Sequence, residues 1–246
     1  FTQICIFATS YVIFKTYLSE TDLRLNDINI MMGHSLGEYT ALACSKKISL
    51  KECSIILKKR GELMSNAVIE VETGMVALIG KDANYVQKII DDNNLDIEIA
   101  NDNSPLQIVI SGAKKELNKS KNIFLDMGIK KFIGLNVSAA FHSKFMKQAQ
   151  EELSEDINLL NFLENKVSII SNYDANIYND NASIIKNLQL QMANKVRWTE
   201  SIKKLEEIGE KNILEFGPNK VLSGLINRIS KSFHIKSINT TEDLLK

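Results

Sequence analysis

The 246-residue sequence has two prolines, three cysteines and no excess of either charge. Thirty basic and thirty acidic residues argue against a nucleic-acid-binding protein or a polybasic membrane-surface protein. No apolar run approaches the length of a membrane span, and the first residues lack the pattern of a signal peptide. Cys5, Cys44 and Cys53 lack metal-ligand spacing and lie on helix-like segments, which is typical of buried cysteines in a reducing compartment. We therefore expect a cytoplasmic protein with no bound metal.

An apolar content of 44% is typical of a globular chain, and this length allows a sizeable core. Apolar periodicity predicts helices at 2–19, 38–43, 49–68, 143–160, 181–193, 198–208 and 220–229. Strands are expected between them, at 28–32, 167–171, 212–216 and 233–238. Such alternation predicts an α/β core with a mainly parallel sheet covered by helices on both faces.

Residues 74–136 have an element order of their own. Strands are expected at 74–80, 96–101, 107–111 and 130–135, with a turn at 102–105 and helices at 83–93 and 113–127. This βαββαβ order is typical of a ferredoxin-like subdomain. We therefore expect a core formed by 1–73 and 137–246, with 74–136 inserted as a smaller subdomain.

The strand at 28–32 ends in Gly33-His34-Ser35-Leu36-Gly37, and a helix follows at once. Gly-x-Ser-x-Gly between a strand and a helix is typical of a nucleophile elbow, whose tight turn requires small residues two positions before and after the serine. Ser35 is therefore the candidate nucleophile. The Leu36 N–H, at the N-terminus of the helix, is a candidate donor to a developing oxyanion.

A serine nucleophile requires a base, and the chain has three histidines. His34 lies inside the elbow, where its side chain should point away from Ser35. His234 lies in the last expected strand, among basic residues, and is interpreted as structural. By elimination the candidate base is His142, in a loop of small residues after the inserted unit.

Arg60 falls within the apolar stripe of the helix expected at 49–68. A buried guanidinium is costly unless it meets an anion. A side chain at the edge of the stripe can instead extend to solvent or pair with an internal carboxylate. The spacing alone does not decide between these interpretations.

Five spaced motifs occur in one order along the chain: Gly33-His34-Ser35-Leu36-Gly37-Glu38-Tyr39, Arg60-Gly61-x-x-Met64, Asn101-x-Asn103-Ser104-Pro105-x-Gln107, Val137-Ser138-x-x-Phe141-His142-Ser143 and Glu215-x-Gly217-Pro218-x-Lys220-Val221-Leu222. Together they resemble the malonyl-CoA:acyl carrier protein transacylases of bacterial fatty-acid synthesis. The resemblance runs from the first residue to the C-terminus. It implies an α/β-hydrolase-like core that carries a ferredoxin-like insert, with the active site between them.

The resemblance also implies a reaction. Ser35 would attack malonyl-CoA with His142 as base, and the phosphopantetheine thiol of acyl carrier protein would then take the malonyl group from the serine. No bound cofactor is implied, and we expect a monomer. Arg60 matches the arginine that binds the free malonyl carboxylate.

Three further positions follow from the resemblance. The backbone carbonyl of Gln191 would orient the histidine in place of a carboxylate. Asn103 and Gln3 would lie at substrate-binding positions.

The sequence departs from the family pattern in two respects. Ala140, Lys144 and Lys195 stand where prolines are usual, and Leu106 where glycine is common. The family also begins with a strand and a Gly-Gln-Gly-Ser-Gln loop, which this sequence lacks. We therefore expect an N-terminally truncated chain.

Two other functions share some of these features. A serine hydrolase or thioesterase could use the same elbow, although such triads run Ser…Asp/Glu…His with a late histidine. An inactive, truncated relative could only dock a carrier protein. The presence of Ser35, His142 and Arg60 together favours the transacylase.

Overall fold

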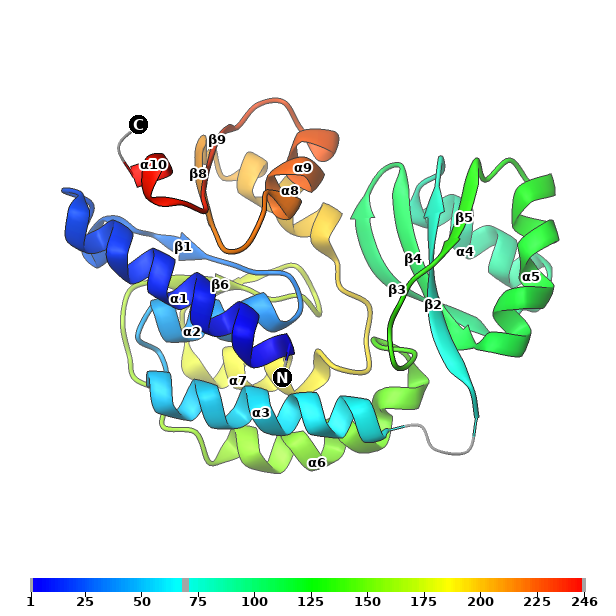
Figure 1. Cartoon of the computed structure of the whole chain (residues 1–246), viewed down its shortest axis with the longest axis horizontal. Helices are drawn as coiled ribbons and strands as arrows, with labels where there is room; N and C mark the ends of the chain where they lie inside the picture. The colour runs from blue at the N-terminus through cyan, green and yellow to red at the C-terminus, as the bar shows by residue number, and fades with distance from the viewer. Residues whose placement is uncertain (1, 68–70, 245–246) are drawn as a thin grey trace.

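The computed structural model describes residues 2–67 and 71–244, which form a larger and a smaller lobe (Figure 1). The helices of the larger lobe are α1 (Thr2–Glu20), α2 (Leu36–Cys44), α3 (Leu50–Asn66), α6 (Lys147–Asn158), α7 (Asn181–Leu190), α8 (Trp198–Glu207), α9 (Val221–Ile229) and α10 (Thr241–Leu244), with 3-10 turns η1 (Leu25–Asp27) and η2 (Lys144–Met146). Its strands are β1 (Ile30–Met31), β6 (Ser168–Ile170), β7 (Ile177–Tyr178), β8 (Asn212–Phe216) and β9 (His234–Ile238). Residue 68, where a helix was expected to end, lies outside the described residues.

The strands of the larger lobe are less continuous than expected, and β1 and β6 are also shorter than their predicted bounds. Within the described residues they form two sheets: β1 pairs in parallel with β6, which pairs antiparallel with β7, and β8 pairs in parallel with β9. Of the strand expected at 28–32, Ile30 and Met31 are paired, with Ser168 and Ile169 of β6. The pairing of β1 with β6 brings the end of β1 next to the loop that follows β6.

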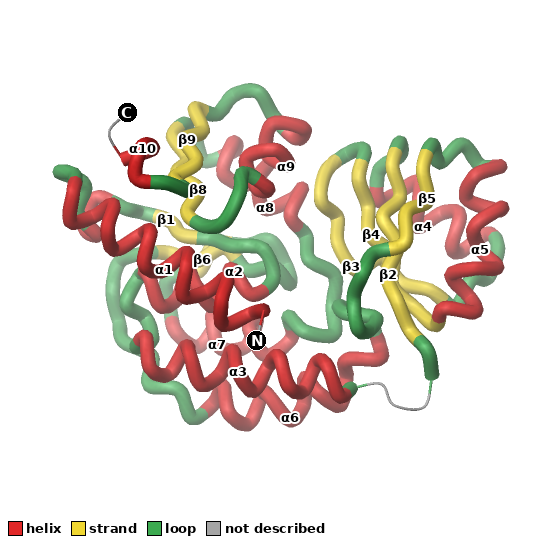
Figure 2. The backbone as a smooth tube through the Cα atoms, viewed as in Figure 1, coloured by secondary structure: helices red, strands yellow, loops and turns green. Residues whose placement is uncertain are grey.

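The smaller lobe contains β2 (Thr73–Ile79), α4 (Ala83–Asp92), β3 (Ile97–Ser104), β4 (Gln107–Ala113), α5 (Lys114–Asp126) and β5 (Lys131–Gly134). The βαββαβ order expected for this segment is observed, and its antiparallel sheet has the strand order β3-β4-β2-β5. Figure 2 shows α5 on the side of this sheet that faces away from the larger lobe. The exact division at 74 and 136 stays a prediction.

Both faces of the two central strands of the smaller sheet, β2 and β4, are buried, which explains their nearly continuous apolar sequences. One face packs against α4 and α5 through a cluster that includes Leu78, Ile110 and Phe124. On the other face Met75 and Val109 belong to a second cluster, which Val137 and Phe141 of the following segment cover. The turn expected at 102–105 is shorter in the structure, because β3 continues to Ser104.

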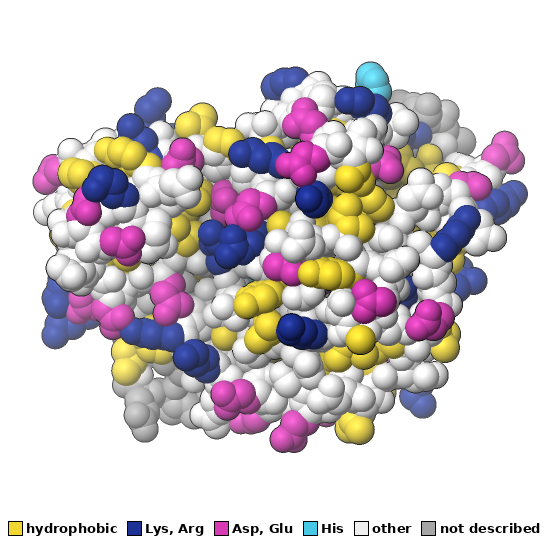
Figure 3. All heavy atoms as spheres, turned by 180° about the vertical axis from the view of Figure 1, so that it is seen from behind, with side chains coloured by type: hydrophobic (Ala, Val, Ile, Leu, Met, Phe, Trp, Pro, Cys, Tyr) yellow, Lys and Arg dark blue, Asp and Glu magenta, His cyan; other side chains and the backbone are white. Residues whose placement is uncertain are grey.

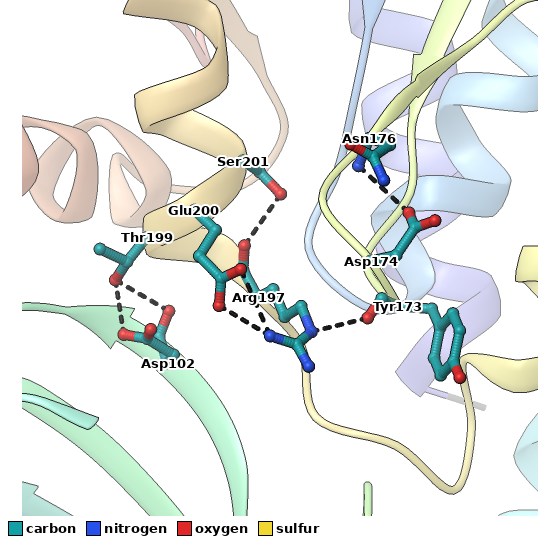
Figure 4. Close-up of polar contacts among 8 residues, drawn as sticks. All are labelled: Asp102, Tyr173, Asp174, Asn176, Arg197, Thr199, Glu200 and Ser201. Atoms are coloured by element: carbon teal, nitrogen blue, oxygen red, sulfur yellow. Dashed lines mark hydrogen bonds and ion pairs between the residues drawn. The ribbon is translucent and has the colours of Figure 1, made fainter. Parts of the chain in front are cut away.

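The edge of β3 holds the segment that leads into α8. The Val196 N–H donates to the Ala100 carbonyl at 2.9 Å, and the Asp102 N–H donates to the Val196 carbonyl at 2.9 Å. Thr199 and Asp102 face each other across this junction (Figure 4), and the Thr199 hydroxyl donates to Asp102 Oδ1 at 2.6 Å. These buried contacts fix one edge of the smaller lobe to the larger lobe.

Helices α3, α4 and α7 begin with side-chain caps. Ser49 and Glu52 form a capping box at α3, and the side chains of Asp82 and Asp180 cap α4 and α7.

The interpretation of all three cysteines as buried is wrong for Cys5, which is exposed because it lies on the outer side of α1. Cys44 and Cys53 are buried.

The surface carries charges of both signs. Figure 3 shows basic and acidic side chains interspersed over the face seen from behind, without a large area of one sign. Among the helices of the described residues, none is long and apolar enough to cross a bilayer.

Candidate active site

Ser35 lies in a strained turn between β1 and α2. Its backbone has φ 53° and ψ −108°, a conformation that L-residues rarely adopt outside tight turns. A Cβ on Gly33 would lie 2.2 Å from the carbonyl carbon and oxygen of Gly37, so the first glycine of the motif is required. The expectation that Gly37 must also be small is not met, because a Cβ there would have no heavy atom within 4 Å.

Asn172 holds this turn from the loop after β6. Its Oδ1 accepts a hydrogen bond from the Ser35 N–H at 2.6 Å, and its Nδ2 donates to the Gly33 carbonyl at 2.8 Å. The Arg197 N–H donates to the Asn172 carbonyl at 3.0 Å, and Arg197 Nε donates to the Tyr173 carbonyl at 2.9 Å (Figure 4). The elbow is therefore held by a side-chain amide that is itself fixed in place.

His142 lies beside Ser35, with its Nε2 2.9 Å from Ser35 Oγ. Its Nδ1 is 3.1 Å from the Gln191 carbonyl oxygen and 3.2 Å from that of Asn194. Carbonyl oxygens can only accept, so Nδ1 carries the proton and Nε2 presents its lone pair to the serine hydroxyl. Burial, followed by the charge of Arg60, lowers the pKa of His142 to about 3. The imidazole is therefore neutral at pH 7, as a general base must be.

Arg60 completes the group of three. It is 1% exposed, so its side chain does not extend to solvent. Its Nη2 donates to Ser35 Oγ and to Gln191 Oε1, both at 3.0 Å, and its Nη1 donates to Gln3 Oε1 at 2.7 Å. Its guanidinium carbon lies 5.3 Å from the centroid of the Tyr39 ring. Within the described residues no carboxylate forms an ion pair with Arg60, so a buried cation beside the nucleophile is neutralised only by more distant charge.

The other expected site residues lie around these three. Leu36 is the first residue of α2, and in the described part of the chain its N–H has no hydrogen-bond acceptor, which leaves the donor available beside Ser35. Asn103 is next to His34, the neighbour of Ser35 in the chain, with its Oδ1 2.8 Å from His34 Nε2. His34 packs 5.5 Å from the Trp198 ring, and its Nε2 bonds Asn103 rather than Ser35.

Comparison with known proteins places this geometry in a family. Residues 26–241 match the family model described as "Acyl transferase domain". The chain belongs to this family. The match confirms the predicted acyltransferase. It includes the smaller lobe and the larger lobe from η1 to the first residue of α10, without α1.

The relatives of this acyl transferase domain have consistent names. The malonyl CoA-acyl carrier protein transacylase of Bacillus subtilis (strain 168) is 37% identical over 216 residues, which is 86% of this chain and 68% of that protein. The solved structure of the malonyl CoA-acyl carrier protein transacylase from Coxiella burnetii has a TM-score of 0.93 and 34% identity, and covers 100% of this chain and 77% of that one.

A second solved structure contains a malonyl-transacylase in complex with its type II polyketide acyl-carrier protein. It has a TM-score of 0.93 and 31% identity, and covers 99% of this chain and 79% of that one. These similarities confirm the predicted α/β fold class.

Three polar residues of the acyl transferase site were not predicted from the sequence: Asn172, Asn194 and Glu38. Asn172 carried a usable signal, since it follows a strand that pairs in parallel with β1, and the carboxyl ends of parallel strands meet at one edge. Asn194 acts through its backbone carbonyl, which no sequence pattern reveals. Glu38 lies in the motif but was not assigned a role.

Proposed function

We propose that this acyl transferase domain moves a malonyl group from malonyl-CoA to the phosphopantetheine thiol of an acyl carrier protein. The observation that carries the proposal is the position of Arg60, whose Nη2 lies 3.0 Å from Ser35 Oγ in a buried environment. A planar guanidinium in such a place suits a substrate that presents a carboxylate close to the reacting carbon. The malonyl thioester has this arrangement, because one methylene separates its carboxylate from the thioester carbonyl.

In the first half-reaction Ser35 Oγ attacks the thioester carbon while His142 Nε2 takes the hydroxyl proton. The Leu36 N–H donates to the oxyanion that develops on the carbonyl oxygen. As the carbon–sulfur bond breaks, the proton on His142 passes to the departing CoA sulfur. The products are CoA and a malonyl ester of Ser35.

In the second half-reaction the carrier's phosphopantetheine thiol gives its proton to His142, and its sulfur attacks the malonyl ester. The bond to Ser35 Oγ breaks, and the serine recovers a proton from His142. The result is a ping-pong sequence with one covalent intermediate. The solved complex of a similar malonyl-transacylase with an acyl-carrier protein supports a carrier protein as acceptor.

The environment of His142 favours this reaction over that of a triad hydrolase. Its Nδ1 faces the carbonyl oxygens of Gln191 and Asn194 rather than the carboxylate that such triads use. We further propose that the protein acts in the cytoplasm as a monomer, without a bound cofactor, and that it supplies fatty-acid or polyketide synthesis.

The experiment that tests the function measures how malonyl is partitioned. The protein is mixed with malonyl-CoA with and without a phosphopantetheinylated carrier protein, and both malonyl-carrier and free malonate are quantified. We expect most malonyl to reach the carrier. Release of malonate at the same rate without the carrier would indicate a thioesterase, and carrier binding without either product would indicate a docking protein.

A further inference from the structure

Glu38 is a buried carboxylate at the centre of the site's hydrogen bonds. It lies on α2, three residues after the nucleophile, and is 1% exposed. Its Oε2 accepts from the Gln191 side-chain amide at 2.8 Å and from the Asn172 N–H at 3.1 Å. Each of these two residues contacts the reacting groups, whereas Glu38 does not contact Ser35 Oγ or His142.

The first branch runs through Gln191. Its Nε2 donates to both Glu38 Oε2 and the Ser35 carbonyl, the latter at 3.0 Å, and its Oε1 accepts from Arg60 Nη2. Arg60 can only donate and an ionised Glu38 can only accept. If the amide were rotated, its NH₂ group would face the donor Arg60 Nη2. Its oxygen would then face two acceptors, Glu38 Oε2 and the Ser35 carbonyl. The carboxylate and the Ser35 carbonyl together select the amide orientation in which Gln191 Oε1 accepts from Arg60 beside Ser35.

The same branch reaches the base, because the backbone carbonyl of Gln191 accepts from His142 Nδ1. The second branch runs through Asn172, whose side chain binds Ser35 N–H and the Gly33 carbonyl. The Glu38 carboxylate therefore connects the segment that orients the histidine with the loop that holds the elbow.

We propose that Glu38 is a positioning residue for acyl transfer: its carboxylate fixes Gln191 and Asn172, and through them the relative positions of Arg60, His142 and Ser35. This inference rests on the proposed assignment of Ser35 and His142 as the reacting pair. It does not depend on which acyl group is transferred.

The charge of Glu38 depends on pH within the working range. Burial is the main reason why its pKa is raised to about 7, and nearby Asp174 adds to this, whereas the hydrogen bonds from Gln191 and Asn172 and the charge of Arg60 oppose it. Tyr39, on the same helix, is kept neutral because burial raises its pKa further. As pH falls below about 7, Glu38 takes up a proton and its hydrogen bonds lose their charge assistance, which weakens the hold on Gln191.

The test measures the rate at which a fluorophosphonate probe labels Ser35 between pH 5 and 9. The wild-type labelling rate should fall about tenfold as the pH drops through 7. This is the fold-change expected when a hydrogen bond to a charged group becomes a hydrogen bond to a neutral group. At every pH, Glu38→Gln should be labelled at the rate that the wild type shows below pH 7, because the glutamine side chain is neutral like protonated Glu38. Glu38→Ala should lower the rate by on the order of 10²-fold, as expected for misplaced reacting groups.

Glu215→Gln is the matched control. Glu215 is also buried, at 9% exposure, and accepts from the Leu222 and Ser223 N–H groups at the start of α9. Its replacement removes a buried carboxylate of the same kind without touching Gln191 or Asn172, so the wild-type pH profile should remain. If Glu215→Gln instead matched Glu38→Gln, the effect would be general destabilisation and the positioning role would be wrong.

Two further results would overturn the proposal: a wild-type labelling rate with no change near pH 7, which needs no variant to fold, or a Glu38→Gln profile equal to that of the wild type. The probe contains neither malonyl nor a carrier thiol. A protein that shows the Glu38-dependent profile but does not transfer malonyl would therefore contradict the proposed function and leave the positioning role intact.

Discussion

Arg60→Ala should lower the rate of malonyl transfer relative to that of acetyl transfer. Arg60 is buried, and within the described residues no carboxylate pairs with it, so the malonyl carboxylate is the anion that suits its charge. Loss of a buried, hydrogen-bonded charge pair costs roughly 2–5 kcal/mol. Malonyl transfer should therefore fall by about 10²-fold or more in kcat/KM. Acetyl transfer should stay constant or rise, because a methyl group no longer faces a cation.

Acetyl transfer is also the internal control for this variant. Arg60 Nη2 donates to Ser35 Oγ at 3.0 Å, so its removal could disturb the nucleophile itself, and that disturbance would slow both acyl groups equally. Arg60→Lys should recover part of the malonyl rate, because a point charge cannot form two parallel hydrogen bonds. Both acyl-CoAs are measured with each variant and one carrier protein. An unchanged malonyl-to-acetyl ratio in Arg60→Ala would make Arg60 structural.

His142→Ala should slow acylation of Ser35 by roughly 10²–10⁴-fold, the usual contribution of a positioned general base. The Nε2 of His142 lies 2.9 Å from Ser35 Oγ, and its pKa of about 3 keeps it unprotonated in the physiological range. Because the pKa of His142 is lowered in the folded protein, the imidazole stays unprotonated from pH 5 to 9. Its titration should therefore not reduce the acylation rate in that range.

His234→Ala is the matched control for this prediction. His234 begins β9 and is exposed, so its removal should leave the rate unchanged. Stopped-flow release of CoA in a single turnover measures acylation directly. Equal rates for the wild type and His142→Ala would exclude His142 as the base.

The sequence predicted most of the local structure because local patterns decide it. Strand β8 (Asn212–Phe216) has the predicted bounds, and the βαββαβ order of the smaller lobe is observed as the periodicity of its elements predicts. The larger lobe was predicted less well. Its strands pair across long sequence separations, as Ile30 does with Ser168, and periodicity contains no information on such pairing.

The candidate site also contains residues that the sequence reveals and residues that only the fold brings into place. Ser35 and His142 could be proposed from the sequence because serine and histidine carry recognisable chemistry, and the family resemblance pointed to Arg60; the structure brings the three side chains together. Asn172 and Asn194 were missed because an amide clamp and a backbone carbonyl depend on where loops meet, not on residue type. Glu38 was missed for a related reason. A glutamate after an elbow is normally interpreted as a favourable first-turn acid, and only its burial against Gln191 reveals another role.

The most direct test of the central claim is the mass of the protein after brief exposure to malonyl-CoA, followed by peptide mapping. We predict one malonyl group per chain, attached to the peptide that contains Ser35, and its loss when phosphopantetheinylated carrier protein is added. Ser35→Ala should acquire no malonyl group under the same conditions. A malonyl adduct that persists in Ser35→Ala, or that maps to a different residue in the wild type, would contradict the proposed mechanism.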